Sequence, residues 1–333
     1  MTLGLTAFGQ NSPASASQIT TVSPSSSQSQ QQLPSSPDAS QLPTPGQQQP
    51  VSTEQDGMFV FRKQIEEVVL HGTVVDDRDR LVTHLDRNAF SVFENGRPQT
   101  ITSFRREDVP VALGIAVDNS GSMRDKRDQV NRAVMNLIRA SNPDDQIFVV
   151  NFSQDPYLDQ DLTSDVASLE RALHQTAMRG TTALYDAVVA SDAHLKNYSR
   201  LDKKVLLVIT DGRDNMSRET LQEALHDLQQ RNGPVVYAIG LMGNGPQNPS
   251  RDALQRLADV TGGAAFFPAD VSEVANITQT LARDIRSQYT LAYKPQDQNA
   301  PGYHAVRVEA HAPGYGHLFV RTKSGYYAGE SVK

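Results

Sequence analysis

The sequence predicts an α/β fold: a doubly wound, mostly parallel sheet with a small flanking β domain built from N- and C-terminal segments. Two observations lead to this prediction. Residues 110–286 alternate short apolar runs with stretches of helical periodicity, and strand-like runs lie on both sides of that region. Alternating strands and helices of this length indicate βαβ units and therefore a mostly parallel sheet. We expect the outer β segments to pair with one another.

The composition excludes several classes of protein. The chain has 333 residues, which suits one large or two modest domains, and 38% of them are hydrophobic. The net charge of −7 is mild and no basic stripe stands out, so we expect no nucleic-acid partner. The lack of cysteine excludes disulfides, Cys-ligated zinc and thiol nucleophiles. No run approaches the roughly 20 apolar residues of a membrane-spanning helix, so we expect no transmembrane span.

The first 56 residues stand apart in composition. Residues 1–9 are apolar, and the small residues Ala7 and Gly9 resemble a signal-peptidase site. This stretch lacks a positive n-region and is short for an h-region, so a signal-peptide remnant and an ordinary disordered terminus both stay open. Residues 10–56 are rich in Ser, Gln and Pro and should form a disordered linker. Such a tether suits an exported protein, and we expect a periplasmic, cell-envelope or secreted location.

Residues 57–107 form the first predicted β segment. Strands are expected over residues 68–75 and 90–94. Asn95-Gly96 is a strong hairpin signal, after which the chain should return as a strand over residues 99–104.

Residues 108–286 form the predicted α/β domain. Apolar runs predict strands over residues 111–117, 146–152, 205–210, 235–240 and 264–267, with an antiparallel edge strand over residues 157–162. Apolar residues at helical spacing predict helices over residues 124–140, 166–173, 183–198, 221–228 and 274–285.

Residues 287–333 form the second predicted β segment, which we expect to pair with residues 57–107. Pro/Gly turns divide this segment into short runs. These runs predict strands over residues 289–293, 305–310 and 318–322.

A turn rich in side-chain oxygens follows the first strand of the α/β domain. Asp118, Ser120 and Ser122 occupy alternate positions of this strand-to-helix turn and should point three oxygens into one small volume. Ligands of open α/β sheets bind at this place, outside the carboxyl ends of the strands. Oxygen-only ligation suits a hard cation such as Mg²⁺ or Mn²⁺. The alternative is local turn chemistry, because Ser122 followed by Asp125 also fits a capping box.

Two further segments should reach the same edge of the sheet. Residues 179–183 read Arg-Gly-Thr-Thr-Ala and form a loop that opens a helix, while Asp211 follows the strand at residues 205–210. If the strands are parallel, these segments and the first turn converge. Together they offer two carboxylates and several hydroxyls.

These residues resemble the von Willebrand factor type A domain, whose sheet is Rossmann-like, together with its metal-ion-dependent adhesion site. The resemblance covers about residues 108–286 and implies that the site binds Mg²⁺ or Mn²⁺, directly or through water. It also implies a partner protein, since family members commonly take an Asp or Glu carboxylate from the bound protein. Thr182 is the alternative to Thr181 in the second loop. The implied metal ligands are Asp118, Ser120, Ser122, Thr181 and Asp211.

The flanking segments carry a second resemblance. Residues 90–99 and residues 325–328, Gly-Tyr-Tyr-Ala, resemble the von Willebrand factor A-related proteins typical of Acidobacteria. Those proteins are mostly predicted to be exported and have no assigned activity, so this resemblance supplies no partner.

We expect a divalent-metal-dependent protein-binding module for adhesion or interaction, with no catalytic and no organic-cofactor-binding residues. Two carboxylates at most balance a divalent ion, and an open coordination position would suit a carboxylate from the partner. The alternative is a structural scaffold component of an envelope assembly. A metal-assisted hydrolase is the weaker alternative, because no His lies in the three loops and no further group offers a base role. Asp214 could support the ion site or lie near a helix start.

Overall fold

The computed structural model describes residues 67–106, 108–174, 180–242, 249–297 and 300–329. These residues all belong to one unit of the chain, Arg62–Lys333. The expected signal-peptide remnant at residues 1–9 and the expected linker at residues 10–56 lie outside the described residues, as do residues 57–66 of the first β segment.

A 6-stranded sheet forms the centre of the α/β domain, in the order β10-β9-β8-β5-β6-β7. All neighbouring strands in it are parallel except β7, which runs antiparallel to β6 at one edge. Every residue of the central strand β5 is buried, as expected for a strand that is covered on both faces. The strands are β5 (Val111–Asp118), β6 (Gln146–Phe152), β7 (Pro156–Thr163), β8 (Lys203–Thr210), β9 (Val235–Gly240) and β10 (Ala265–Phe266).

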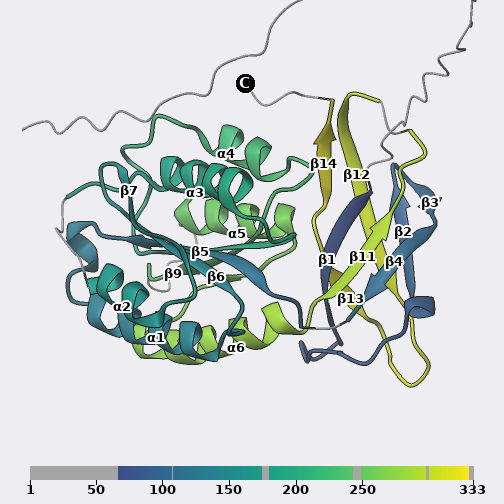
Figure 1. The fold of residues 1–333 in the computed structure, drawn as a ribbon, viewed down its shortest axis with the longest axis horizontal. Coiled ribbons are helices and arrows are strands. Elements are labelled where there is room, and N and C mark those ends of the chain that lie inside the picture. The colour runs from purple at the N-terminus through teal and green to yellow at the C-terminus, as the bar shows by residue number, and fades with distance from the viewer. Residues whose placement is uncertain (1–66, 107, 175–179, 243–248, 298–299, 330–333) are drawn as a thin grey trace, which may run out of the picture. The chain divides into compact units, whose positions relative to one another are not determined.

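Helices cover both faces of this sheet (Figure 1). Leu113, Ile115 and Val117 of β5 pack with α1, α2 and α6, whereas Ala112 and Ala116 pack with α3, α4 and α5. Because successive side chains of a strand point to opposite faces, β5 contributes to two separate hydrophobic cores, one on each face of the sheet. The helices are α1 (Arg127–Ala140), α2 (Val166–His174), α3 (Leu184–Tyr198), α4 (Leu221–Leu228), α5 (Pro249–Thr261) and α6 (Val274–Arg286).

Two 4-stranded antiparallel sheets form the β domain, in the orders β13-β1-β11-β4 and β14-β12-β2-β3. Strands from the two ends of the described chain alternate within them: β11 lies between β1 and β4, and β12 lies between β14 and β2. A third hydrophobic core fills the space between these sheets. The strands are β1 (Val68–Val75), β2 (Phe90–Glu94), β3 (Arg97–Gln99), β4 (Ile101–Arg105), β11 (Tyr289–Tyr293), β12 (Gly302–Ala310), β13 (Phe319–Arg321) and β14 (Gly325–Ala328).

The predicted fold class is confirmed: a doubly wound, mostly parallel sheet with flanking antiparallel sheets built from N- and C-terminal segments. The hairpin signal at Asn95-Gly96 is also confirmed. Both residues have positive φ, 49° and 78°, as a tight two-residue hairpin requires. Within the described residues no helix is long and apolar enough to cross a membrane.

Two elements were not predicted, one predicted strand is divided and one helix begins later than predicted. The strand expected over residues 99–104 is divided into β3, which pairs with β2, and β4, which pairs with β11 in the other sheet. Helix α5 and strand β14 were absent from the sequence-based expectation. The helix expected from residue 124 begins at Arg127, because a 3-10 turn over Gly121–Met123 precedes it. This turn belongs to the oxygen-rich segment after β5.

A buried cluster of polar side chains lies inside the β domain around Glu94. Its carboxylate accepts hydrogen bonds from the hydroxyls of Tyr293 (2.5 Å) and Tyr326 (3.2 Å) and lies 2.9 Å from Nδ1 of His304. The other ring nitrogen of His304 lies 2.9 Å from the carbonyl oxygen of Ala300. Both ring nitrogens of His304 thus face oxygen atoms, and the carboxylate of Glu94 is enclosed by three side chains.

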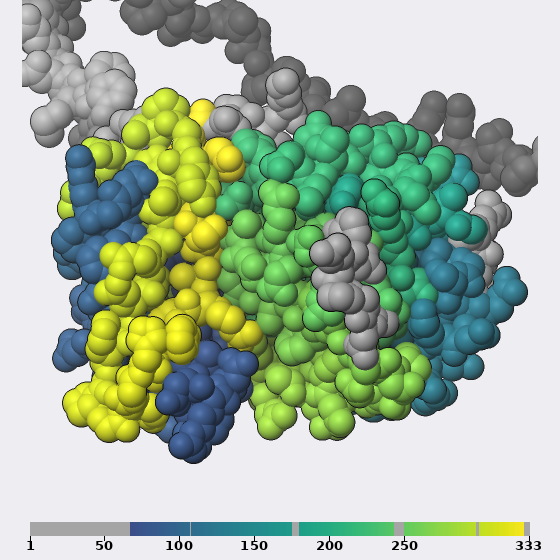
Figure 2. Space-filling model, turned by 180° about the vertical axis from the view of Figure 1, so that it is seen from behind, coloured from purple at the N-terminus to yellow at the C-terminus, as the bar shows by residue number. Residues whose placement is uncertain are grey.

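Polar contacts join the β domain to the α/β domain. Asp284, in the last turn of α6, accepts hydrogen bonds from Thr73 Oγ1 (2.6 Å) and Arg321 Nη2 (2.7 Å). On the face shown in Figure 2, the yellow C-terminal residues lie beside the green surface of the α/β domain. There the backbone N–H of Tyr327 donates to the carbonyl of Gln229 at 3.0 Å. The β domain is therefore tied to both layers of helices.

Candidate metal centre

Asp118 ends β5 and lies at the centre of the oxygen-rich edge. Its side chain is fully buried. One carboxylate oxygen accepts the backbone N–H of Ser120 (2.8 Å) and the other accepts the hydroxyl of Thr210 (2.6 Å). Thr210 ends the neighbouring parallel strand β8, and the pairing of Val117 with Ile209 sets the two strand ends level. Parallel register thus joins residues that are distant in sequence.

A line of hydrogen bonds connects the first turn to the third segment. The hydroxyl oxygens of Ser120 and Ser122 are 3.0 Å apart, and the Ser122 hydroxyl donates to Asp211 at 2.7 Å. The Asp211 side chain is only 2% exposed. Four of the five predicted ligands are therefore brought together: Asp118, Ser120, Ser122 and Asp211.

The second loop contributes a threonine beside Asp118. A Cβ atom built on Gly212 would lie 3.0 Å from the hydroxyl oxygen of Thr182 and 3.6 Å from Asp118 Oδ2. Thr182 is buried, and its backbone N–H donates to the Asn215 side chain at 2.9 Å. Thr181 is half-buried, and within the described residues it forms no hydrogen bond with the other four predicted ligands. The structure thus places the Thr182 hydroxyl beside Gly212, on which the carboxylate of Asp118 also borders.

Two cations at the start of α1 contact these carboxylate segments. Lys126 Nζ donates to Oδ2 of Asp211, and Arg127 Nη1 donates to the backbone carbonyl of Asp118 at 2.9 Å. Arg127 is buried and also donates to the side chain of Asn151. The sequence analysis did not single out either cation. The available signal was two adjacent basic residues at a helix N-terminus, where acidic residues are the stabilising choice.

Burial shapes the ionisation of this site. Burial raises the pKa of the Asp118 carboxyl, and hydrogen bonds from Thr210 and Ser120 oppose the rise. The nearby charge of Asp211 raises this pKa further. Burial lowers the pKa of Arg127 to about 10, against the opposing effect of Asp118. A carboxylate buried this deeply is stabilised in its charged form by a cation, which the site must supply or bind.

Asp214 serves the start of a helix. Its carboxylate accepts the backbone N–H of Tyr185, in the first turn of α3, at 3.1 Å, and the hydroxyl of Ser217 at 2.5 Å. Of the two interpretations offered for Asp214, the structure supports the position near a helix start. Its hydrogen bonds hold the loop after Asp211 against the loop that carries Thr182.

The donor set consists of oxygen atoms alone. In the described part of the chain no three His, Cys, Asp or Glu side chains gather at one place, so a metal centre here depends on hydroxyl oxygens. Two carboxylates and neutral hydroxyls fit a hard divalent ion that keeps some of its water. The close approach of Gly212 to Thr182 and Asp118 leaves room for such an ion only if residue 212 has no side chain.

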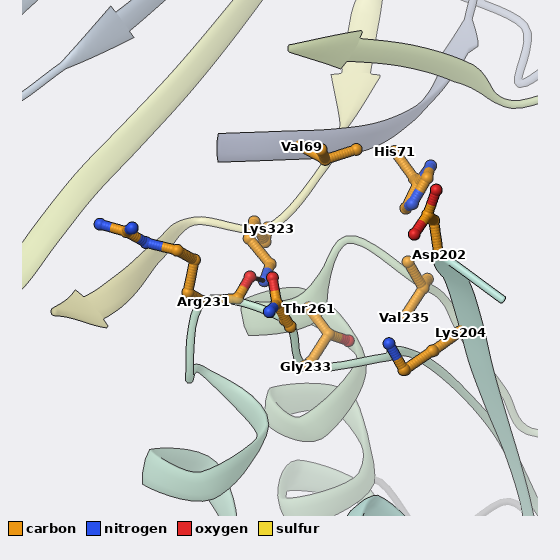
Figure 3. A pocket seen from close by; sticks show the side chains of 10 residues that line it. Val69, His71, Asp202, Lys204, Arg231, Gly233, Val235, Thr261 and Lys323 are labelled. Atoms are coloured by element: carbon orange, nitrogen blue, oxygen red, sulfur yellow. Dashed lines mark hydrogen bonds between the residues drawn. The ribbon is translucent and has the colours of Figure 1, made fainter. Parts of the chain in front are cut away.

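A small cavity at the other end of the sheet is separate from this centre (Figure 3). It has a volume of about 30 Å³, and Lys204 and Val235 in its wall lie at the amino ends of β8 and β9. His71 of β1 and Lys323 complete it from the side of the β domain. The cavity therefore belongs to the junction of the two domains.

The comparisons with known proteins agree with this architecture. Residues 113–213 match the model of the von Willebrand factor type A domain. No curated protein matches the chain. Solved structures to which the chain is similar include proximal thread matrix protein 1 from the mussel byssus (20% identity, 54% of this chain and 49% of that chain, TM-score 0.45). The chain thus spans about half the length of that protein. The mussel protein has also been solved with zinc in its metal-ion-dependent adhesion site (MIDAS) motif.

Two bacterial structures are also similar. One is a von Willebrand factor type A protein from Catenulispora acidiphila (15% identity, 74% of this chain and 76% of that chain, TM-score 0.48). The other is the corresponding domain of the type V pili tip protein Mfa5 from Porphyromonas gingivalis (13% identity, 54% of this chain and 97% of that chain, TM-score 0.46). From the family match and the sheet topology we conclude that this chain contains a von Willebrand factor type A domain.

Proposed function

We propose that this chain is a divalent-metal-dependent protein-interaction module, which takes an Asp or Glu carboxylate of its partner on a bound Mg²⁺ or Mn²⁺. The observation that carries the proposal is the line of hydrogen bonds that brings Asp118, Ser120, Ser122 and Asp211 to one edge of the sheet. Three of these side chains are nearly or fully buried, so their oxygens are held in place before an ion arrives.

The charge of the donor set explains why the partner would present a carboxylate. Asp118 and Asp211 together neutralise one divalent ion, and the hydroxyls of Ser120 and Ser122 add no charge. Six-coordinate Mg²⁺ would retain water at its remaining positions, where a hard anionic oxygen can replace it. Ser122 is exposed, so a partner can approach the site from its side.

For the second loop we propose Thr182 as the hydroxyl ligand in place of Thr181. Its oxygen lies beside Asp118 and Gly212, whereas Thr181 is one residue farther from the helix start. Replacing each threonine in turn by valine tests which of them is the ligand, because valine keeps the shape of the side chain and removes the hydroxyl oxygen. We expect only Thr182→Val to weaken ion binding.

The proposed role is non-enzymatic. Both carboxylates of the site serve as ligands, and no His occurs in the three loops that form it. We also propose that the protein is exported and acts in the periplasm, the cell envelope or outside the cell, with residues 10–56 as a tether. The resemblance of the flanking β segments to acidobacterial proteins stays a prediction.

Ion binding is tested by titration calorimetry of Mn²⁺ and Mg²⁺ into the full chain, with Zn²⁺ as a competitor. We expect Asp118→Ala to abolish binding of Mn²⁺ and Mg²⁺ while circular dichroism shows a folded protein. Asp125→Ala is the matched control, because Asp125 is exposed and lies in the same turn. Unchanged affinity in Asp118→Ala would overturn the proposal.

The partner's role is tested by pull-down from an envelope extract with and without EDTA. Capture that depends on the ion and is lost in Asp118→Ala supports the interaction module. Capture that persists in EDTA favours the alternative, a scaffold in which the ion is structural. Hydrolysis of phosphatase or peptidase substrates that requires Asp118 would favour the hydrolase.

A further inference from the structure

Lys126 contacts one of the two carboxylate oxygens of Asp211. The Lys126 ammonium donates to Asp211 Oδ2, while Oδ1 of the same carboxylate accepts the Ser122 hydroxyl. The Asp211 side chain is 2% exposed and that of Lys126 is 33% exposed. The contact therefore joins a nearly buried anion to a cation whose stem reaches the surface.

A lysine at the position of Lys126 does not stabilise helix α1 by itself. It is the N-cap of α1, and its side chain makes no capping hydrogen bond there. Arg127 follows at the first helical position, so two cations stand at the positive end of the helix dipole. Local preference would place acidic or hydroxyl residues here. The two carboxylates at the strand ends provide the compensating interaction.

The four charged groups form a neutral set: Asp118 and Asp211 carry two negative charges, and Lys126 and Arg127 carry two positive charges. Arg127 is held in the interior by Asp118, Asn151 and the carbonyl of Leu173. Among the described residues the Lys126 ammonium contacts one carboxylate, that of Asp211, and its side chain is partly exposed. The Lys126 ammonium can therefore move away from the site into solvent, whereas movement of Arg127 would require its buried guanidinium to leave the interior.

We propose that Lys126 is a tethered competitor of the divalent ion: it neutralises Asp211 in the ion-free protein and is displaced when an ion binds. This inference rests on the proposed function of the site. An ion that binds an oxygen of Asp211 lies close to the groups that already contact this carboxylate, the Ser122 hydroxyl and the Lys126 ammonium. Ser122 is itself a proposed ligand, and an ammonium next to a divalent cation is repelled, so Lys126 is the group that leaves.

Two consequences follow from the competition. The affinity for the ion is lower than the five oxygen ligands alone would give, because the Lys126–Asp211 ion pair has to be broken first. Ion binding also releases a positive charge to the surface beside the ion, where the carboxylate of a partner would arrive. Lys126 thereby couples ion uptake to the charge of the binding face.

The first test compares Mn²⁺ affinity by calorimetry in three variants. We expect Lys126→Met to bind Mn²⁺ about tenfold more tightly than the unaltered chain, since it removes the competing charge but keeps the length of the side chain. Lys126→Arg keeps a cation and should stay within about twofold of the unaltered affinity. Arg124→Met removes the same charge from an exposed position two residues away and should also change affinity less than about twofold.

The second test follows the amine of Lys126 directly. The protein is labelled with an amine-acetylating reagent in EDTA and in saturating Mn²⁺, and mass spectrometry measures the labelling of Lys126. We expect Mn²⁺ to increase this labelling severalfold in the unaltered chain and to leave it unchanged in Asp118→Ala. This readout does not depend on the stability of any Lys126 variant.

The outcomes separate the two proposals. If the unaltered chain and Lys126→Met bind Mn²⁺ equally well and the labelling does not respond to Mn²⁺, the competition is wrong while the metal site stands. If neither protein binds Mn²⁺, the proposed function fails and the inference fails with it. Binding that is weak in the unaltered chain and restored in Lys126→Met supports both.

Discussion

At the scale of single residues, Gly212 is the position where the site is most easily closed. A methyl group there would lie 3.0 Å from Thr182 Oγ1 and 3.6 Å from Asp118 Oδ2. We predict that Gly212→Ala weakens Mn²⁺ binding by about tenfold, because the methyl group displaces the Thr182 hydroxyl oxygen by a few tenths of an ångström, whereas the 3.6 Å contact with Asp118 is an ordinary one. Calorimetry gives the affinity.

The control for Gly212 is Gly121→Ala in the first turn. A methyl group at Gly121 would meet no atom within 4 Å, so we expect little change in Mn²⁺ affinity. Both variants should unfold within a few degrees of the unaltered chain. An equal loss of affinity in the two variants would show that any added methyl group near the turn is harmful and would contradict the argument from geometry.

The same scale shows what the sequence could and could not predict of the site. The proximity of Asp118, Ser120, Ser122 and Asp211 was predictable, because the turns that carry them follow two apolar runs that pair as parallel strands. The choice between Thr181 and Thr182 was not, since adjacent residues of an irregular loop point in different directions and no periodicity fixes them. The contact between Lys126 and Asp211 depends on how α1 enters the sheet, which local patterns do not encode.

At the scale of elements, long and strongly patterned segments were predictable. β5 is an uninterrupted apolar run, which matches its burial on both faces. Helix α5 was missed because its buried stripe is narrow and half alanine: Ala253, Leu254, Leu257 and Ala258. Strand β14 has only four residues, too few for an alternating pattern to predict it. Its pairing with β12 is a long-range contact that the local sequence does not indicate.

Helix α6 carries a prediction at this scale. Asp284 lies in its last turn, at the end of the helix dipole that disfavours an anion, yet its side chain is only 3% exposed. Thr73 and Arg321 of the β domain supply the compensating hydrogen bonds. We predict that Asp284→Ala lowers the free energy of unfolding by about 3 kcal/mol, because it leaves both donors without their acceptor.

Urea denaturation followed by circular dichroism measures the effect at Asp284. Arg283→Ala is the control on the same helix, since Arg283 is exposed and, among the described residues, its side chain donates only to Gln279 and Thr280 of α6. We expect the control to change stability by less than about 0.5 kcal/mol. If both variants are equally stable, α6 does not depend on the β domain for its position.

At the scale of the whole described unit, the junction between the two domains is sensitive to acid through His71. This residue of β1 lines the cavity of Figure 3 together with Lys204, Lys323 and Asp202. Burial, together with the smaller effect of the charges of Lys203, Lys323 and Lys204, lowers the pKa of His71 to about 3. The imidazole is thus neutral in the folded protein over a range in which an unfolded chain would protonate it.

The direction of the effect follows from proton linkage. Between the unfolded pKa of 6.5 and the folded pKa of about 3, the unfolded chain binds more protons than the folded one. Stability contributed by His71 is therefore complete above pH 6.5 and is lost as the pH falls through this window. From pH 8 to pH 5 the loss from this group alone is about 2 kcal/mol.

We predict that His71→Gln flattens the dependence of stability on pH between 8 and 5 by about this amount, because glutamine cannot gain the proton. Urea denaturation at a series of pH values measures it, and His84→Gln, at an exposed position, is the control. His71 Nδ1 lies 3.1 Å from the hydroxyl of Thr290, a hydrogen bond that the amide of glutamine can replace. A slope that is the same in His71→Gln and in the unaltered chain would mean that other groups of the molecule set its acid sensitivity, and that the lysines around this cavity leave the imidazole free to protonate.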